Sequence, residues 1–190
     1  MATLSTPSTP STPSTASTPT APAKLSHVVL QTNRLPQMRD WYCDVLGAHP
    51  AYDNGRLAFL AYDDEHHRVG IISLDDYAER DTPVVGLQHF SFTYDTLEVL
   101  LATYERLKAD GIRPVWTVNH GPTVSFYYAD PDGNHVELQV DVFATTEETD
   151  AYMNSAAYQT NPRGVDIDPE DLLARLRAGE SVASLTARGN

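Results

Sequence analysis

The chain is poor in several features that would point to particular classes of protein. It has one cysteine, Cys43, in 190 residues, so it cannot form an internal disulfide. No apolar run reaches the roughly 18 residues that a membrane-spanning helix needs. Basic residues are scarce: 13 Lys and Arg against 26 Asp and Glu give a net charge of −13. That charge repels nucleic-acid phosphates and anionic membranes, so we expect neither partner and a cytoplasmic protein.

Residues 1–23 differ in composition from the rest of the chain. They repeat Ser, Thr and Pro, carry no charged side chain and have almost no large apolar side chain. Such a segment buries too little surface to offset the entropy lost on ordering. It also lacks the basic and apolar regions of a secretory signal. We predict a disordered tail over 1–23, a folded domain over 24–142 and a C-terminal extension over 143–190.

Two stretches of the folded domain resemble copies of one unit. The first begins with KLSHVVLQTN at Lys24, and the second begins with GLQHFSFTYD at Gly86. In each copy a β-rich run that carries one histidine precedes an amphipathic helix pattern and then a meander of strands. Both copies therefore read βαβββ, over about 24–80 and 86–142. In the extension, 146–158 is predicted as a short helix, and Asp168-Pro169 is typical of the start of another.

Strand parity gives a first indication of where the histidines and one glutamate point. His27 shares a strand face with Leu25 and Val29, which suggests that it points inward. His89 lies on the face opposite two phenylalanines, so it lines either a solvated face or a polar cavity. Glu137 alternates with apolar residues in NHVELQVD and has the same two possibilities. A histidine at the same place in both copies favours a shared function.

The segments SHVVL, LQHFSF and ADPDGNHVEL resemble the vicinal oxygen chelate superfamily, which includes glyoxalase I, fosfomycin and bleomycin resistance proteins, and extradiol catechol dioxygenases. The resemblance covers about 24–142. It implies an α+β fold in which two βαβββ modules form an open, curled mixed sheet barrel with the helices outside. The family's metal ligands match His27, His89 and Glu137, which favours the cavity for His89. Two imidazoles and one carboxylate suit Fe(II), with Mn(II) as an alternative.

Gly70 distinguishes this chain from the glyoxalase I-like members. When the last strands of the two copies are aligned, Gly70 falls opposite Glu137, where those members have a carboxylate ligand. Glycine offers no side-chain ligand, so three protein ligands would leave three positions open on an octahedral metal. A catecholate could occupy two of these positions and dioxygen the third.

Three further residues match positions of the extradiol dioxygenases. In DEHHRVGI, His67 matches the family's acid–base histidine, although its neighbour His66 stays an alternative. His120 and Tyr127 match a histidine and a tyrosine that hydrogen-bond the substrate oxygens. Tyr128, on the opposite strand face, is predicted to serve in packing.

The resemblance thus implies an extradiol, ring-cleaving dioxygenase that uses Fe(II) and O2 on a small aromatic diol, for example a biphenyl-2,3-diol-like compound. With two modules, the chain resembles the one-domain members, which usually form homo-oligomers. Two alternatives remain. One is another metal-dependent member, such as a glyoxalase-like isomerase, a thiol transferase or an antibiotic resistance protein. The other is a metal-free protein that binds small molecules.

Overall fold

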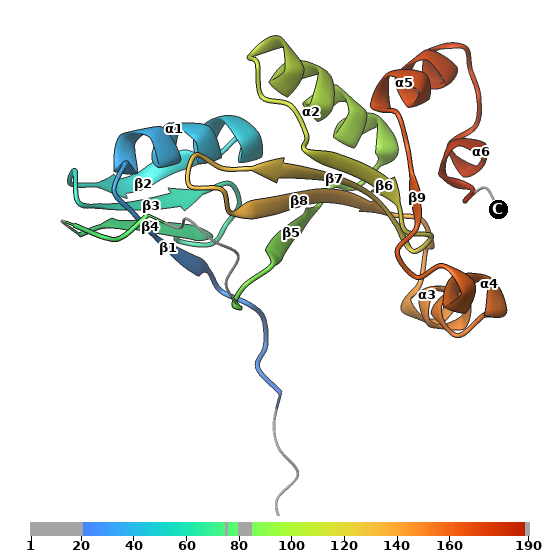
Figure 1. Ribbon diagram of the computed structural model, residues 1–190, viewed down its shortest axis with the longest axis horizontal. Coiled ribbons are helices and arrows are strands. Elements are labelled where there is room, and N and C mark those ends of the chain that lie inside the picture. The colour runs from blue at the N-terminus through green and yellow to red at the C-terminus, as the bar shows by residue number, and fades with distance from the viewer. Residues whose placement is uncertain (1–20, 75, 80–84, 189–190) are drawn as a thin grey trace, which may run out of the picture.

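A computed structural model describes residues 21–74, 76–79 and 85–188 (Figure 1). Residues 1–20 of the predicted tail lie outside the described residues, as does the predicted end of the first module at residue 80. Within the described part of the chain, no helix is long and apolar enough to cross a membrane.

The first module has the predicted βαβββ order, and its sheet has the strand order β1-β4-β3-β2. Strands β1 and β4 are parallel, and the other neighbouring strands are antiparallel. Helix α1 has Pro36 in its first turn and ends at Gly47, whose φ of 62° is the left-handed conformation that glycine adopts without strain. The elements are β1 (Val28–Thr32), α1 (Leu35–Leu46), β2 (His49–Asp53), β3 (Leu57–Ala61) and β4 (Val69–Ser73).

The second module repeats this arrangement, with the strand order β5-β8-β7-β6 and a fifth strand, β9 (Val165–Asp166), beyond β6. The predicted turn between β7 and β8 is present, and Asp130 accepts hydrogen bonds there from the backbone N–H groups of Asp132 and Asn134. The elements are β5 (His89–Thr93), α2 (Leu97–Ala109), β6 (Trp116–Asn119), β7 (Thr123–Ala129) and β8 (His135–Asp141).

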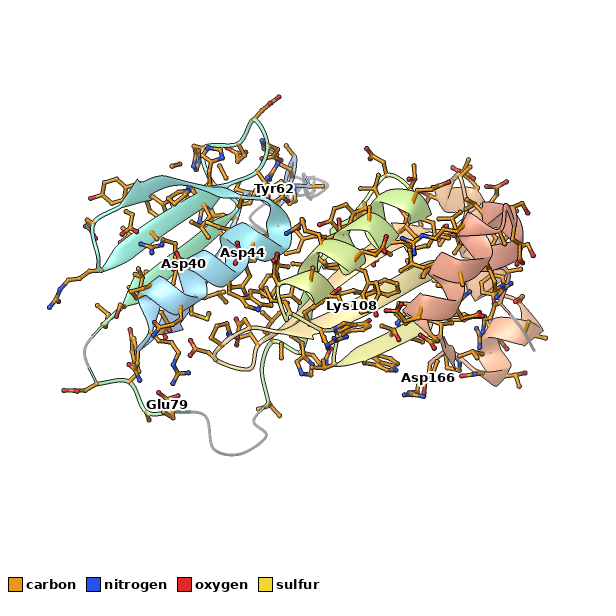
Figure 2. The ribbon with its side chains drawn as sticks, turned by 90° about the horizontal axis from the view of Figure 1, so that it is seen from above. Asp40, Asp44, Tyr62, Glu79, Lys108 and Asp166 are labelled. Carbon is orange, nitrogen blue, oxygen red and sulfur yellow. The ribbon has the colours of Figure 1, made fainter. Side chains whose placement is uncertain are left out.

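Both helices cover the same side of the two sheets, and the opposite sides of the sheets stay open (Figure 1). Seen from above, α1 and α2 lie next to each other over the junction of the modules (Figure 2). The core lies between helices and strands, where Met38, Tyr42, Phe126 and Leu138 are fully buried. The two sheets are separate, and β1 and β5 form their inner edges. The predicted α+β fold with helices outside an open sheet arrangement is therefore confirmed.

The strand face that carries His27 is the open one, which corrects the prediction that His27 points inward. Leu25 is 75% exposed and Val29 is 47% exposed, whereas Leu30 and Thr32 on the other face of β1 are buried. Helix α1 covers the face of Leu30, so the residues that alternate with it are left on the open side of the sheet.

The C-terminal extension packs along the second module. The single helix predicted over 146–158 is two helices, because the chain turns at Asn154 and Ser155 and Ser155 caps a new helix. The predicted start at Asp168 is confirmed, since its side chain accepts a hydrogen bond from the Glu170 N–H. Helix α5 then packs on α2, where the Tyr104 hydroxyl donates to Glu170 over 2.6 Å. The elements are α3 (Thr146–Met153), α4 (Ala156–Thr160), β9 (Val165–Asp166), α5 (Pro169–Arg177) and α6 (Val182–Thr186).

Candidate active site

A row of polar side chains crosses the open face of the second sheet. It comes from three adjacent strands, because Glu137 of β8 pairs with Ser91 of β5 on one side and with Tyr127 of β7 on the other. His89 Nε2 lies 3.1 Å from one carboxylate oxygen of Glu137, and the Tyr127 hydroxyl donates to the other oxygen over 2.9 Å. Glu137 is only 5% exposed. Both of its carboxylate oxygens therefore have a partner within the protein.

Tyr127 also links this row to His120. The Tyr127 hydroxyl lies 3.1 Å from His120 Nε2, and the indole ring of Trp116 stacks on the phenol ring at 4.8 Å between centroids. Burial first, and then the nearby Glu137 carboxylate, raise the pKa of Tyr127 far above its ordinary value. Tyr127 therefore stays a protonated hydrogen-bond donor at neutral pH. Its neighbour Tyr128 is 1% exposed and lies in the core, which confirms the prediction that it packs.

Three histidines gather on the first module instead. The ring of His27 lies 4.4 Å from that of His67 between centroids, and His67 Nδ1 lies 2.6 Å from His66 Nδ1. His67 is buried, whereas the side chain of His66 is 67% exposed. Burial first, and then the two neighbouring histidines, lower the pKa of His67. His67 Nε2 is a buried atom without a hydrogen-bond partner among the described residues. Such an atom is available to a ligand.

The strand registers support the alignment of the two copies. In the first module Gly70 pairs with Val29 and with Phe59, and in the second Glu137 pairs with Ser91 and with Tyr127. Gly70 therefore occupies the place of Glu137, as the sequence predicts, and Phe59 occupies the place of Tyr127. A Cβ atom at Gly70 would lie 3.3 Å from a Val29 methyl and 3.5 Å from the Phe59 ring. The first copy of the row is thus apolar apart from His27.

The structure brings together two of the three predicted metal ligands. A site for one divalent ion fits His89 and Glu137, because two ligand atoms at right angles, each about 2.1 Å from an ion, lie roughly 3 Å apart. Among the residues that the structure describes, no three His, Cys, Asp or Glu side chains form a group that could hold a metal. His27 lines a small cavity of about 110 Å³ together with Phe90 and Ser91, so it faces the strand that carries His89. The ligand set itself stays a prediction.

One contact to the site was not predicted from the sequence. The backbone oxygen of Arg163, in the C-terminal extension, lies 2.6 Å from His120 Nδ1. A backbone carbonyl contact leaves no residue type by which it could be recognised. The two-residue strand β9 that brings it there is likewise too short for a periodic pattern.

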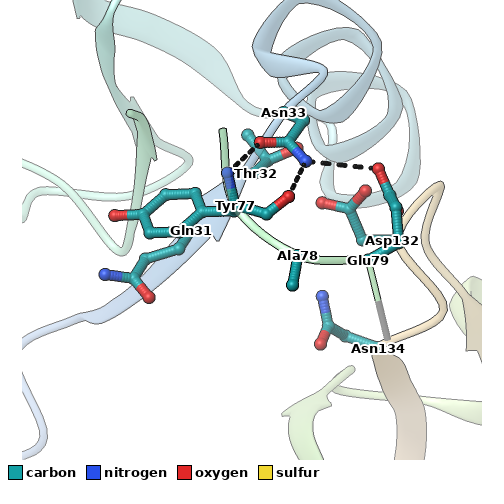
Figure 3. Close-up of a pocket in the computed structure, with 8 residues that line it drawn as sticks. All are labelled: Gln31, Thr32, Asn33, Tyr77, Ala78, Glu79, Asp132 and Asn134. Carbon is teal, nitrogen blue, oxygen red and sulfur yellow. Dashed lines mark hydrogen bonds between the residues drawn. The ribbon is translucent and has the colours of Figure 1, made fainter. Parts of the chain in front are cut away.

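A second cavity lies away from these residues, at the junction of β1, residues 77–79 and the turn before β8 (Figure 3). It has a volume of about 170 Å³. Asn33 lines this cavity, and its side chain forms hydrogen bonds with the backbone of Tyr77 and with the carboxylate of Glu79. None of the predicted site residues lines it.

Comparison with known proteins shows the family to which the chain belongs. The family described as the glyoxalase/bleomycin resistance protein/dioxygenase superfamily matches residues 24–138. The chain is 48% identical to biphenyl-2,3-diol 1,2-dioxygenase 2 of Rhodococcus globerulus over 164 residues, which cover 86% of each chain. It is 47% identical to biphenyl-2,3-diol 1,2-dioxygenase 3 of the same organism over 167 residues, which cover 87% of this chain and 88% of that one. Both matches are longer than residues 1–142, so each extends into the C-terminal extension.

Solved structures show the same fold at lower identity. A lactoylglutathione lyase from Agrobacterium tumefaciens has a TM-score of 0.51 and 23% identity, over 63% of this chain and 94% of that one. A fosfomycin resistance protein from Listeria monocytogenes has a TM-score of 0.51 and 23% identity, over 67% of this chain and 98% of that one. The two curated relatives confirm the prediction of a dioxygenase. The chain belongs to the glyoxalase/bleomycin resistance protein/dioxygenase superfamily.

Proposed function

We propose that the protein is an extradiol dioxygenase that cleaves the ring of a catechol-type substrate with one Fe(II) ion and O2, and that biphenyl-2,3-diol is the first compound to test. In the names of the two relatives, the 1,2 bond that is cleaved lies beside the 2,3-diol, which is extradiol cleavage. The observation that carries the proposal is the chain of contacts from His89 through Glu137 and Tyr127 to His120. It joins a carboxylate–imidazole pair to two hydrogen-bonding groups on the same open face.

His27, His89 and Glu137 would hold the metal, which would supply Lewis acidity towards the two diol oxygens and reactivity with dioxygen. The Glu137 carboxylate is set for this role, because Tyr127 donates to its second oxygen and fixes its orientation. With Gly70 in the equivalent place of the first module, the protein would offer three ligands and leave the other positions to the reactants.

The other residues of the site would bind the diol and move its protons. Tyr127 stays protonated at neutral pH, and its one proton, which is donated to Glu137 before the diol binds, would turn to one substrate oxygen, with His120 beside it. His67 would accept and return a proton at Nε2, because its lowered pKa keeps the imidazole neutral at pH 7 and this atom has no partner among the described residues. Its neighbour His66 is largely exposed and is the weaker candidate.

The test is to purify the protein without oxygen, measure its metal content, and then add Fe(II), biphenyl-2,3-diol and air. We expect about one iron per chain, uptake of oxygen and a yellow ring-cleaved product. His89→Ala should lose both the iron and the activity, whereas His49→Ala, on the exposed edge strand β2, should keep both. Activity in the presence of Zn but not of Fe, or an unchanged His89→Ala variant, would overturn the proposal. Assembly into a homo-oligomer stays a prediction.

A further inference from the structure

The C-terminal extension contacts the site at His120. The backbone oxygen of Arg163 can only accept a hydrogen bond, so His120 Nδ1, which lies 2.6 Å from it, carries a proton. The second nitrogen, Nε2, lies 3.1 Å from the hydroxyl of Tyr127, which donates its own proton to Glu137. A carbonyl from outside the two modules thus determines which nitrogen faces the site.

Gly164 allows the backbone of the extension to lie close to Asn119 and His120. A Cβ atom at this position would lie 2.4 Å from the Asn119 backbone oxygen and 2.8 Å from His120 Cα, which are closer than a side chain tolerates. The φ of Gly164 is +100°. The turn is closed by Asn161, whose side chain bonds both the N–H and the carbonyl of Gly164. Val165 then pairs with Asn119 as part of β9.

Thr186 and Arg188 contact the same segment. The Arg188 guanidinium donates to the His120 backbone oxygen over 3.1 Å and also to the Asn161 backbone oxygen. Asn119 donates to the Thr186 backbone oxygen over 2.8 Å and is itself 3% exposed. Two separate parts of the extension therefore contact residues 119 and 120.

We propose that the C-terminal extension is a positioning element of the active site, in which the turn from Asn161 to Gly164 fixes the Nδ1-protonated form of His120 and aims Nε2 at Tyr127. Arg163 and Gly164 act on His120 as positioning residues through their backbone atoms. The role of His120 towards substrate rests on the proposed dioxygenase function. The proton on Nδ1 and its cause do not, because they follow from the contact of His120 with the Arg163 backbone oxygen.

Protonation of His120 Nδ1 is measured on the full-length protein without added metal. Side-chain ¹⁵N spectra distinguish a protonated ring nitrogen from an unprotonated one, and His120→Gln identifies the signals of His120 among the seven histidines. We expect Nδ1 of wild-type His120 to be protonated. Gly164→Ala should displace the acceptor and leave Nδ1 unprotonated in part of the molecules. Gly179→Ala is the matched control, because Gly179 has a similar φ of +87° and a Cβ atom there meets nothing within 4 Å.

Activity of the iron-loaded enzyme gives the second measurement. A displacement of a positioned group by about 1 Å costs on the order of 100-fold in rate, so Gly164→Ala should lower kcat about 10- to 100-fold with a smaller change in KM. Gly179→Ala should stay within about twofold of wild type. If Gly164→Ala does not fold, Asn161→Ala loosens the same turn without a clash and should act in the same direction.

The outcomes separate the two proposals. A wild-type protein that cleaves no diol refutes the dioxygenase, while the spectra still decide the positioning. A wild-type His120 that is unprotonated at Nδ1, or a His120 spectrum unchanged by both Gly164→Ala and Asn161→Ala, overturns the positioning role.

Discussion

Replacing Tyr127 with phenylalanine removes one hydroxyl from the centre of the polar row. That hydroxyl donates to Glu137 over 2.9 Å and lies 3.1 Å from His120 Nε2. The ring itself should fit, because Phe59 occupies the equivalent place in the first module. Loss of one preorganised donor to developing charge lowers kcat by about 100- to 1,000-fold, which corresponds to about 2.7–4 kcal/mol in the activation barrier. We expect a loss of this size in Tyr127→Phe.

Tyr128→Phe provides the matched control. The two tyrosines are adjacent on β7, but Tyr128 faces the core, and its buried hydroxyl has no hydrogen-bond partner among the described residues. Removing it should leave kcat unchanged and should not lower the free energy of unfolding. The assay is the initial rate of yellow product at saturating diol, together with urea unfolding of both variants. If the two variants have the same kcat, or if Tyr127→Phe stays within about threefold of wild type, Tyr127 is not the donor inferred here.

Three smaller predictions concern stability. Tyr42→Phe should lower the free energy of unfolding by about 1.5–3 kcal/mol in urea, because the buried Tyr42 hydroxyl donates to the Asp130 carboxylate; no loss would refute this contribution. Asp168→Ala should cost about 1 kcal/mol in the same assay, because it removes the acceptor for the Glu170 N–H at the start of α5, and an unchanged midpoint would contradict it. Burial first, and then the hydrogen bond to Glu170, raise the pKa of Tyr104 to about 12. The contribution of Tyr104 to the free energy of unfolding should be complete below about pH 10, where tyrosine ionises in the unfolded chain, and should fall as the pH rises towards 12. Tyr104→Phe should remove that part of the pH dependence of stability.

Much of the fold can be predicted from the sequence because local patterns agree with the tertiary arrangement. The apolar spacing around Met38 and Tyr42 predicts the buried face of α1, and Gly47 predicts its end. The alignment of Gly70 with Glu137 also follows from sequence, since two copies of one module keep the same strand register. Strand parity gives the wrong direction for the His27 side chain because the apolar residues that alternate in phase with it, Leu25 and Val29, lie on the open face. Burial of that face depends on which side α1 packs, and no alternation pattern records this.

The contacts of the C-terminal extension could not be predicted for a different reason. The contacts to Asn119 and His120 are long-range and involve backbone atoms, such as the Arg163 oxygen beside His120 Nδ1, and these atoms are the same in every residue type. The sequence around Gly164 predicts a turn, but it does not predict that the backbone of Asn119 packs against this glycine. Only the assembled structure brings the segment to His120.

The equivalent rows of the two modules explain why the metal site proposed here would have to span both of them. The row of the second module supplies His89 and Glu137, which face each other. In the equivalent row of the first module, Gly70 and Phe59 take the places of Glu137 and Tyr127, and His27 is the one residue of that row whose side chain can bind a metal. A third ligand from the first module must therefore reach across the junction between β1 and β5, where the small cavity beside Ser91 lies. The placement of His27 then depends on how the modules pack together. The contacts that hold them, such as the buried hydrogen bond from α1 to the turn before β8, thereby become part of what assembles the site.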